Sequence, residues 1–176
     1  MPAQDVATRF EEIYHSTYKK VLTYITAKCR HTADIADIFQ DTYMELYQVI
    51  CKRGLDYVAN DEAFALWLAK KKLARYYSLR VRLQMLVSFK GAEDETDLSD
   101  FEADAFATED FAVNHALLEA ARQFIQAQPE VVQKVFYLHY EVDLTIAEVA
   151  KALSMKESTV KSKLYRTLKE LRKILA

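Results

Sequence analysis

Two short amphipathic segments lie between Thr145 and Ala176, separated by only three or four residues, and they limit the folds open to this chain more than any other feature of the sequence. Apolar residues recur in both segments at three- and four-residue steps, which is the period of an α-helix. Thr145 with Glu148, and Ser154 with Glu157, have the spacing of a capping box, so each helix has a predicted start. Two helices joined by so short a turn predict a helix-turn-helix.

The second of these helices carries hydroxyl and basic side chains on the face opposite its leucines. Small hydroxyl side chains near a helix N-terminus let the backbone approach phosphates, and Arg and Lys further along reach base edges or phosphate oxygens. An ordinary surface helix with a solvated basic face is the alternative interpretation. The predicted duplex-DNA contacts are Ser158, Thr159, Lys161, Ser162, Lys163, Arg166 and Lys169.

The scarcity of Gly and Pro indicates an all-α fold. The chain has only 2 Gly and 2 Pro among 176 residues, too few for the tight turns of a sheet protein, and 51% of its residues are apolar. We predict no strand. A helix is expected to begin near Val113, and Pro129 is expected at the first position of the next helix.

A formal net charge of −2 conceals a strong asymmetry along the chain. The stretch from Glu93 to Asp110 contains acidic residues and no Lys or Arg, and its flanks are basic. We predict two small helical domains, residues 1–88 and 113–176, joined by an acidic linker at 89–112. The linker is expected to be a solvated tether, and the alternative is that it folds back onto the basic segments.

Three helices are predicted in the first domain: from Val6, from about Thr32, and over 61–85. The third contains the run KKKLARYYSLRVR, in which aromatic rings alternate with cations. Such a pattern suits single-stranded nucleic acid, because rings stack on bases and cations follow the backbone. The alternative is that the tyrosines pack in the core. The candidate residues are Lys70, Lys71, Lys72, Arg75, Tyr76, Tyr77, Arg80 and Arg82.

This order of parts resembles a sigma factor of bacterial RNA polymerase, of the small extracytoplasmic-function (ECF), sigma-70-like type. The first half resembles region 2 through the run DIADIFQDTYMELY that begins at Asp34 and through Trp67-Leu68. The second half resembles region 4 through TIAEVAKAL and STVKSKLYR. The chain departs from the family where it has Asp143 and Ser154 in place of the usual Gly, and where Lys71 and Ala74 follow Trp67.

The resemblance implies a specificity subunit that binds core RNA polymerase and directs it to promoters with −10 and −35 elements. The expected partners are promoter DNA, the clamp and flap of the core enzyme, and, as a further candidate, an anti-sigma factor. The basic and aromatic run is expected to hold the melted −10 strand, and the last helix to read the −35 element. The expected polymerase contacts are Asp34, Asp37, Ile38, Gln40, Asp41, Met44 and Glu45.

Other classes of protein fit the sequence less well. No paired carboxylates, nucleophile motif or phosphate-binding Gly loop indicates an enzyme, and we expect no cofactor. The four His and two Cys lack metal-ligand spacing, so we predict no metal site. No signal peptide or apolar run long enough to insert in a membrane is seen, so we expect a cytoplasmic protein. The remaining alternatives are a helix-turn-helix regulator independent of polymerase and a helical adaptor that binds only proteins.

Overall fold

The computed structural model describes residues 3–87 and 109–175, and for 3–4, 79–87, 109–117 and 175 it describes the backbone alone. The described residues form helices joined by short connections, and none of them lies in a strand, which confirms the predicted all-α class. Their helices, in chain order, are α1 (Ala3–Lys28), η1 (Thr32–Asp34), α2 (Ile35–Arg53), η2 (Leu55–Tyr57), α3 (Asp61–Val87), α4 (Glu109–Gln126), α5 (Glu130–Phe136), η3 (Tyr137–Glu141), α6 (Ile146–Ala152) and α7 (Glu157–Leu175). None of these helices is long and apolar enough to span a bilayer.

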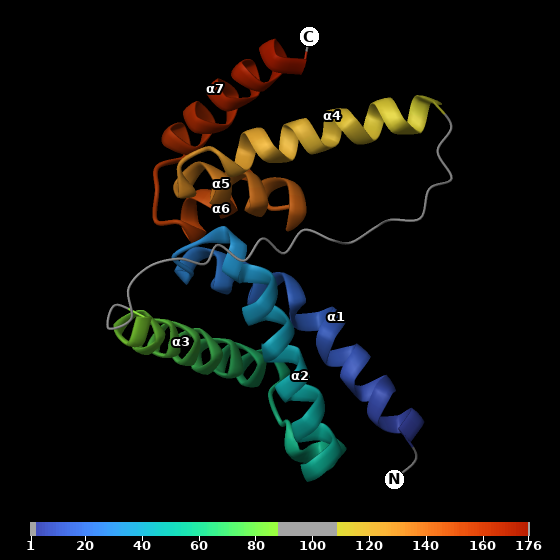
Figure 1. The fold of residues 1–176 in the computed structure, drawn as a ribbon. Helices are drawn as coiled ribbons and strands as arrows, with labels where there is room; N and C mark the ends of the chain where they lie inside the picture. The colour runs from blue at the N-terminus through green and yellow to red at the C-terminus, as the bar shows by residue number, and fades with distance from the viewer. Residues whose placement is uncertain (1–2, 88–108, 176) are drawn as a thin grey trace.

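The helices α1, α2 and α3 pack together around one apolar core (Figure 1). The side chains of this core are apolar residues spaced three or four positions apart, because this spacing places them on one face of each helix. Burying each large aliphatic side chain contributes about 1.5–3 kcal/mol to folding. The fully buried members include Ile13, Val21, Ile25, Ile38, Leu46, Ile50 and Leu68.

Local signals set the connection from α2 to α3. The N–H of Gly54 donates to the carbonyl of Ile50, and its φ of 97° is a backbone conformation that glycine adopts without a steric penalty. At the start of α3, the side-chain oxygen of Asn60 accepts from the N–H of Ala63 at 2.9 Å. This hydrogen bond caps the helix and fixes where α3 begins.

A second core lies among α5, η3, α6 and α7. Val135, Leu138 and Val149 are fully buried there, and Val160 and Leu164 of α7 complete it. Pro129 immediately precedes α5 instead of occupying its first position, one residue earlier than predicted. The predicted linker at 89–112 lies mostly outside the described residues, and α4 begins at Glu109.

The two cores lie against each other, with α5 and α6 next to the N-terminal helices (Figure 1). Leu22 of α1 and Tyr137 of η3 pack against both clusters of buried residues. Helix α1 contacts α6 and η3, and η1 contacts α5. The helices of the first half therefore hold those of the second half in one defined arrangement.

Candidate nucleic-acid interface

The first helix of the predicted helix-turn-helix is α6, and its start is the capping box read from the sequence. The N–H of Thr145 donates to Glu148 at 2.8 Å, and the N–H of Glu148 donates to the Thr145 hydroxyl at 3.3 Å. The backbone hydrogen bond from Thr145 lowers the pKa of the Glu148 carboxyl. Two N–H groups at the helix end are thereby satisfied without tertiary contacts.

The turn after α6 differs from the prediction. Ser154 does not cap α7: its φ is 55°, and α7 begins at Glu157. The N–H of Met155 donates to the Ala150 carbonyl at 2.8 Å, and the N–H of Ser154 donates to the Lys151 carbonyl at 3.3 Å. This pair of bonds is a Schellman motif, which ends a helix at a left-handed residue. The turn is thus set by the end of α6, so the second predicted capping box was wrong.

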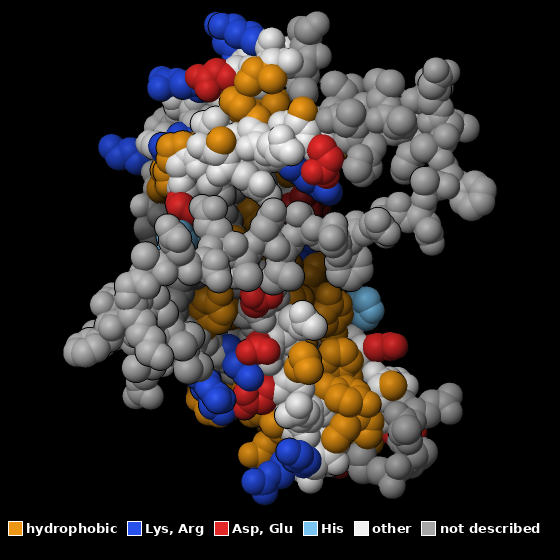
Figure 2. Space-filling model, viewed as in Figure 1, with side chains coloured by type: hydrophobic (Ala, Val, Ile, Leu, Met, Phe, Trp, Pro, Cys, Tyr) orange, Lys and Arg blue, Asp and Glu red, His pale blue; other side chains and the backbone are white. Residues whose placement is uncertain are grey.

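Helix α7 has one buried face and one charged face. Val160, Leu164 and Thr167 are buried against the second core, and Lys163 is half-buried. Basic side chains project from the outer edge of α7 at the top of Figure 2. The predicted contacts Ser158, Thr159, Lys161, Ser162, Arg166 and Lys169 are all exposed.

In α3, Lys70, Lys71 and Arg75 are exposed, whereas Lys72 is half-buried. Two of the lysines are paired with α2, because the Glu45 carboxylate lies 2.8 Å from Lys71 Nζ and 3.0 Å from Lys72 Nζ. The hydrogen bond from Lys71 is the main cause that lowers the pKa of Glu45. A predicted polymerase contact and two predicted DNA contacts are therefore bound to one another. The side chains of Arg80 and Arg82 lie outside the described residues.

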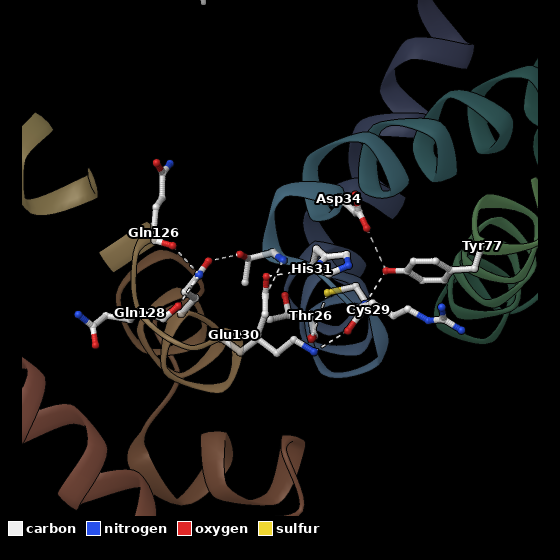
Figure 3. Close-up of polar contacts among 12 residues, drawn as sticks. Thr26, Cys29, His31, Asp34, Tyr77, Gln126, Gln128 and Glu130 are labelled. Atoms are coloured by element: carbon white, nitrogen blue, oxygen red, sulfur yellow. Dashed lines mark hydrogen bonds and ion pairs between the residues drawn. The ribbon is translucent and has the colours of Figure 1, made fainter. Parts of the chain in front are cut away.

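Tyr76 and Tyr77 are half-buried, and their hydroxyls donate to the Asp34 carboxylate at 3.0 and 3.2 Å. Asp34 itself is only 5% exposed, so this predicted polymerase contact lies inside the fold. Burial is the main cause that raises the pKa of the Tyr77 hydroxyl. Both predicted stacking tyrosines are therefore held by their hydroxyls, and Figure 3 shows Tyr77 in contact with Asp34.

A row of three aromatic rings, of which Tyr57 and Trp67 are exposed, lies along η2 and α3, and the sequence predictions gave it no role. The rings of Tyr57 and Phe64 are 6.2 Å apart, and those of Phe64 and Trp67 are 5.6 Å apart. Cations lie over both ends of the row: Lys71 Nζ is 5.3 Å from the Trp67 ring, and the Arg53 guanidinium is 5.8 Å from that of Tyr57. Trp67 is 53% exposed. The three-residue spacing of Phe64 and Trp67 is visible in the sequence and places both on one face of α3. The contact with Tyr57 could not be predicted, because Tyr57 belongs to a different element, η2.

The outer face of α2 combines polar and apolar side chains. Asp37, Gln40, Asp41 and Met44 are exposed, Glu45 is half-buried, and Ile38 is buried. A groove of about 600 Å³ between α1 and α2 is lined by rings that include Phe10, Tyr14 and Tyr47, with Met44 beside them. Figure 2 shows this hydrophobic patch over the lower part of the molecule, where Figure 1 places α1 and α2.

The described residues contain no group of three His, Cys, Asp or Glu side chains arranged to hold a metal ion. Residues 118–171 match the family model for sigma-70, region 4, which confirms the resemblance of the second half. A search of curated proteins finds no match. The matched segment covers the C-terminal half of α4, all of α5, η3 and α6, and most of α7. The match supports a sigma-factor-like DNA-binding role in transcription.

Proposed function

We propose that this chain, whose residues 118–171 match sigma-70 region 4, is a sigma factor of the ECF type that binds core RNA polymerase and directs it to promoters with −10 and −35 elements. The observation that carries this proposal is the matched helix-turn-helix with an exposed basic recognition helix. The same chain also carries a helical domain with an aromatic and cationic row on one side and an acidic, apolar-centred face on another.

Helix α7 would enter the major groove at the −35 element. In a helix-turn-helix the second helix contacts base edges while the first crosses the backbone. Arg166 is long enough to read a guanine through two hydrogen bonds, which discriminates by about 1–3 kcal/mol. The exposed hydroxyls of Ser158 and Thr159 lie at the N-terminal end of α7, where the backbone approaches phosphates.

Helix α3 would hold the melted −10 strand, with Lys70, Lys71 and Arg75 following its phosphates. The row from Tyr57 through Phe64 to Trp67 offers ring faces and edges next to those cations. A base stacked on an exposed ring contributes about 1–3 kcal/mol. The roles predicted for Tyr76 and Tyr77 require their hydroxyls to leave Asp34.

The outer face of α2 would bind the clamp of the polymerase. Exposed Asp37, Gln40 and Asp41 around Met44 give polar groups surrounding an apolar centre, as in a typical interface. Asp34 and Ile38 would support this face from beneath, because both are buried. In this role the protein selects promoters in the cytoplasm, and the polymerase performs the chemistry.

Binding to purified core polymerase tests this proposal. The tagged chain should retain core polymerase, and Met44→Asp should weaken retention at least about tenfold by placing a charge at the apolar centre of the interface. Ile174→Asp is the matched control, since Ile174 is exposed on α7, and it should retain polymerase normally. Retention of duplex DNA without polymerase would favour a polymerase-independent regulator, and retention of neither would favour a protein-binding adaptor.

A further inference from the structure

The turn between α1 and α2 carries most of the polar contacts between the two halves of the molecule. The Glu130 carboxylate of α5 accepts from the N–H of Thr32 at 3.0 Å and lies 3.3 Å from Nδ1 of His31. The hydroxyl of Thr32 donates to the side chain of Gln133. Lys134 donates to the backbone carbonyl of Cys29. Three polar residues of α5, Glu130, Gln133 and Lys134, thus contact one short turn.

The same turn is bound on its other side by α3 (Figure 3). The hydroxyl of Tyr77 accepts from the N–H of Arg30 and donates to Asp34. The guanidinium of Arg30 lies 5.2 Å from the centre of the Tyr77 ring. Tyr77 therefore fixes the backbone of the turn in the middle of the segment that α5 holds.

We infer that the turn at residues 29–34 is a latch that keeps the two halves of the free protein together, and that it releases when Tyr77 leaves Asp34 to bind single-stranded DNA. A tyrosine that turns toward a base gives up its bonds to Arg30 and Asp34. The turn then loses the contact that orders it, and α5 loses an ordered set of donors and acceptors. The DNA-binding part of this inference rests on the proposed function, and the latch itself does not.

The distance between the halves measures the latch directly in the full chain. Cys51 is exposed on α2, whereas Cys29 is buried and its pKa is raised to about 11, mainly by burial, so one dye or spin label reacts selectively at Cys51. Glu170→Cys supplies a second label on the exposed side of α7. The doubly labelled protein should give a single, narrowly distributed distance, and Glu130→Ala should add a second, longer one.

Glu130→Ala should shift the closed-to-open ratio by about tenfold, because it removes a charged acceptor from the contact. The matched control is Glu119→Ala, whose carboxylate pairs with Arg122 within α4 and should leave the distance unchanged. Lys134→Met removes the bond to Cys29 while keeping the length of the side chain, so it gives a second opening variant if Glu130→Ala does not fold. A distance unchanged in both variants would overturn the latch.

The coupling to DNA has its own test. A single-stranded oligonucleotide should lengthen the distance between the two labels in the protein whose latch is intact. Tyr77→Phe, which keeps the ring and loses the hydroxyl, should lengthen the same distance without DNA. Tyr47→Phe, an exposed tyrosine on α2, is the control. Because the oligonucleotide binds the open form, Glu130→Ala should raise its affinity by the factor by which the substitution raises the open fraction, at most about tenfold. If Glu130→Ala opens the molecule while Tyr77→Phe and the oligonucleotide leave it closed, the coupling is overturned and the latch stands.

Discussion

In the proposed single-strand site, Trp67 is the residue on which binding should most depend. It is the only tryptophan in the chain, its side chain is 53% exposed, and a lysine lies over its ring. Its place beside the cations of α3 is the reason that we propose an unpaired base as its partner, because exposed rings next to cations suit single-stranded nucleic acid.

Replacing this ring tests the site. Trp67→Ala should weaken binding of a single-stranded oligonucleotide by about tenfold, because one stacked base contributes about 1–3 kcal/mol. Fluorescence anisotropy of a labelled oligonucleotide measures the loss, and quenching of the sole tryptophan reports the contact in the unchanged protein. Tyr165→Ala removes an exposed ring from α7 and should bind normally. Equal affinity of Trp67→Ala and the unchanged protein would remove Trp67 from the site.

Substitutions at Arg166 and Lys169 test whether α7 binds duplex DNA and reads its bases. Arg166→Ala should lower the preference for a selected duplex over a scrambled one by about tenfold, since a two-bond contact to guanine discriminates by about 1–3 kcal/mol. Lys169→Ala should weaken binding to both duplexes and reduce the salt slope by about 0.9. Titrations at several salt concentrations separate the two effects. Equal losses on both duplexes for Arg166→Ala would contradict a base-reading role.

Among the elements, the turn between α6 and α7 contains a backbone conformation that lowers the free energy of unfolding. Ser154 has a φ of 55°, in the left-handed region, and Asp143 before α6 has a φ of 59°. These are the two positions at which the sequence departs from the Gly usual in the family it resembles. A residue with a Cβ in this conformation costs about 1–2 kcal/mol relative to one without it.

Ser154→Gly should therefore raise the free energy of unfolding, by about 0.5–1 kcal/mol after the greater flexibility of glycine in the unfolded chain is allowed for. Urea denaturation measures it. Ser158→Gly makes the same change in the first turn of α7, where the backbone is helical, and should lower stability by up to about 1 kcal/mol. The interpretation of the turn fails if both substitutions destabilise the protein equally.

The ion pairs between α2 and α3 give a second prediction at this scale. Glu45→Gln should raise single-strand affinity by about threefold, because it frees Lys71 and Lys72 from pairs of the kind that contribute up to about 1 kcal/mol near a surface. The pKa of Glu45 is below its ordinary 4.5, so the pairs persist at neutral pH and are lost only as the pH falls through that lowered value. Glu12→Gln, a remote substitution on α1, should leave the affinity for single-stranded DNA unchanged. If Glu45→Gln also leaves it unchanged, Lys71 and Lys72 do not contact the strand.

Much of the helical architecture could be predicted from the sequence because its signals are local. The periodic apolar residues of α1 and α2 and the capping box at Thr145 specify helices without knowledge of the fold. The turn at Ser154 could not be predicted, because Ser154 with Glu157 also fits a capping box and only the backbone bonds at the end of α6 decide between them. The row at Trp67 was missed because Tyr57 joins it from another element.

At the scale of the whole molecule, the arrangement of the two halves was beyond sequence reasoning. It depends on single side chains of α5, such as Glu130 and Lys134, that meet one turn and follow no period. In the proposed function, Tyr77 belongs to the site for single-stranded DNA, and it also holds the turn through which the two halves are in contact.

If this chain gives core RNA polymerase its choice of promoter, it should determine where transcription starts, and run-off transcription from a randomised promoter library measures those starts. Purified core polymerase is assayed with and without the chain, and the transcript starts are sequenced. We expect starts that depend on the chain and lie downstream of a shared pair of motifs at −35 and −10. Starts that are the same with and without the chain, from reactions in which it still binds duplex DNA, would contradict it.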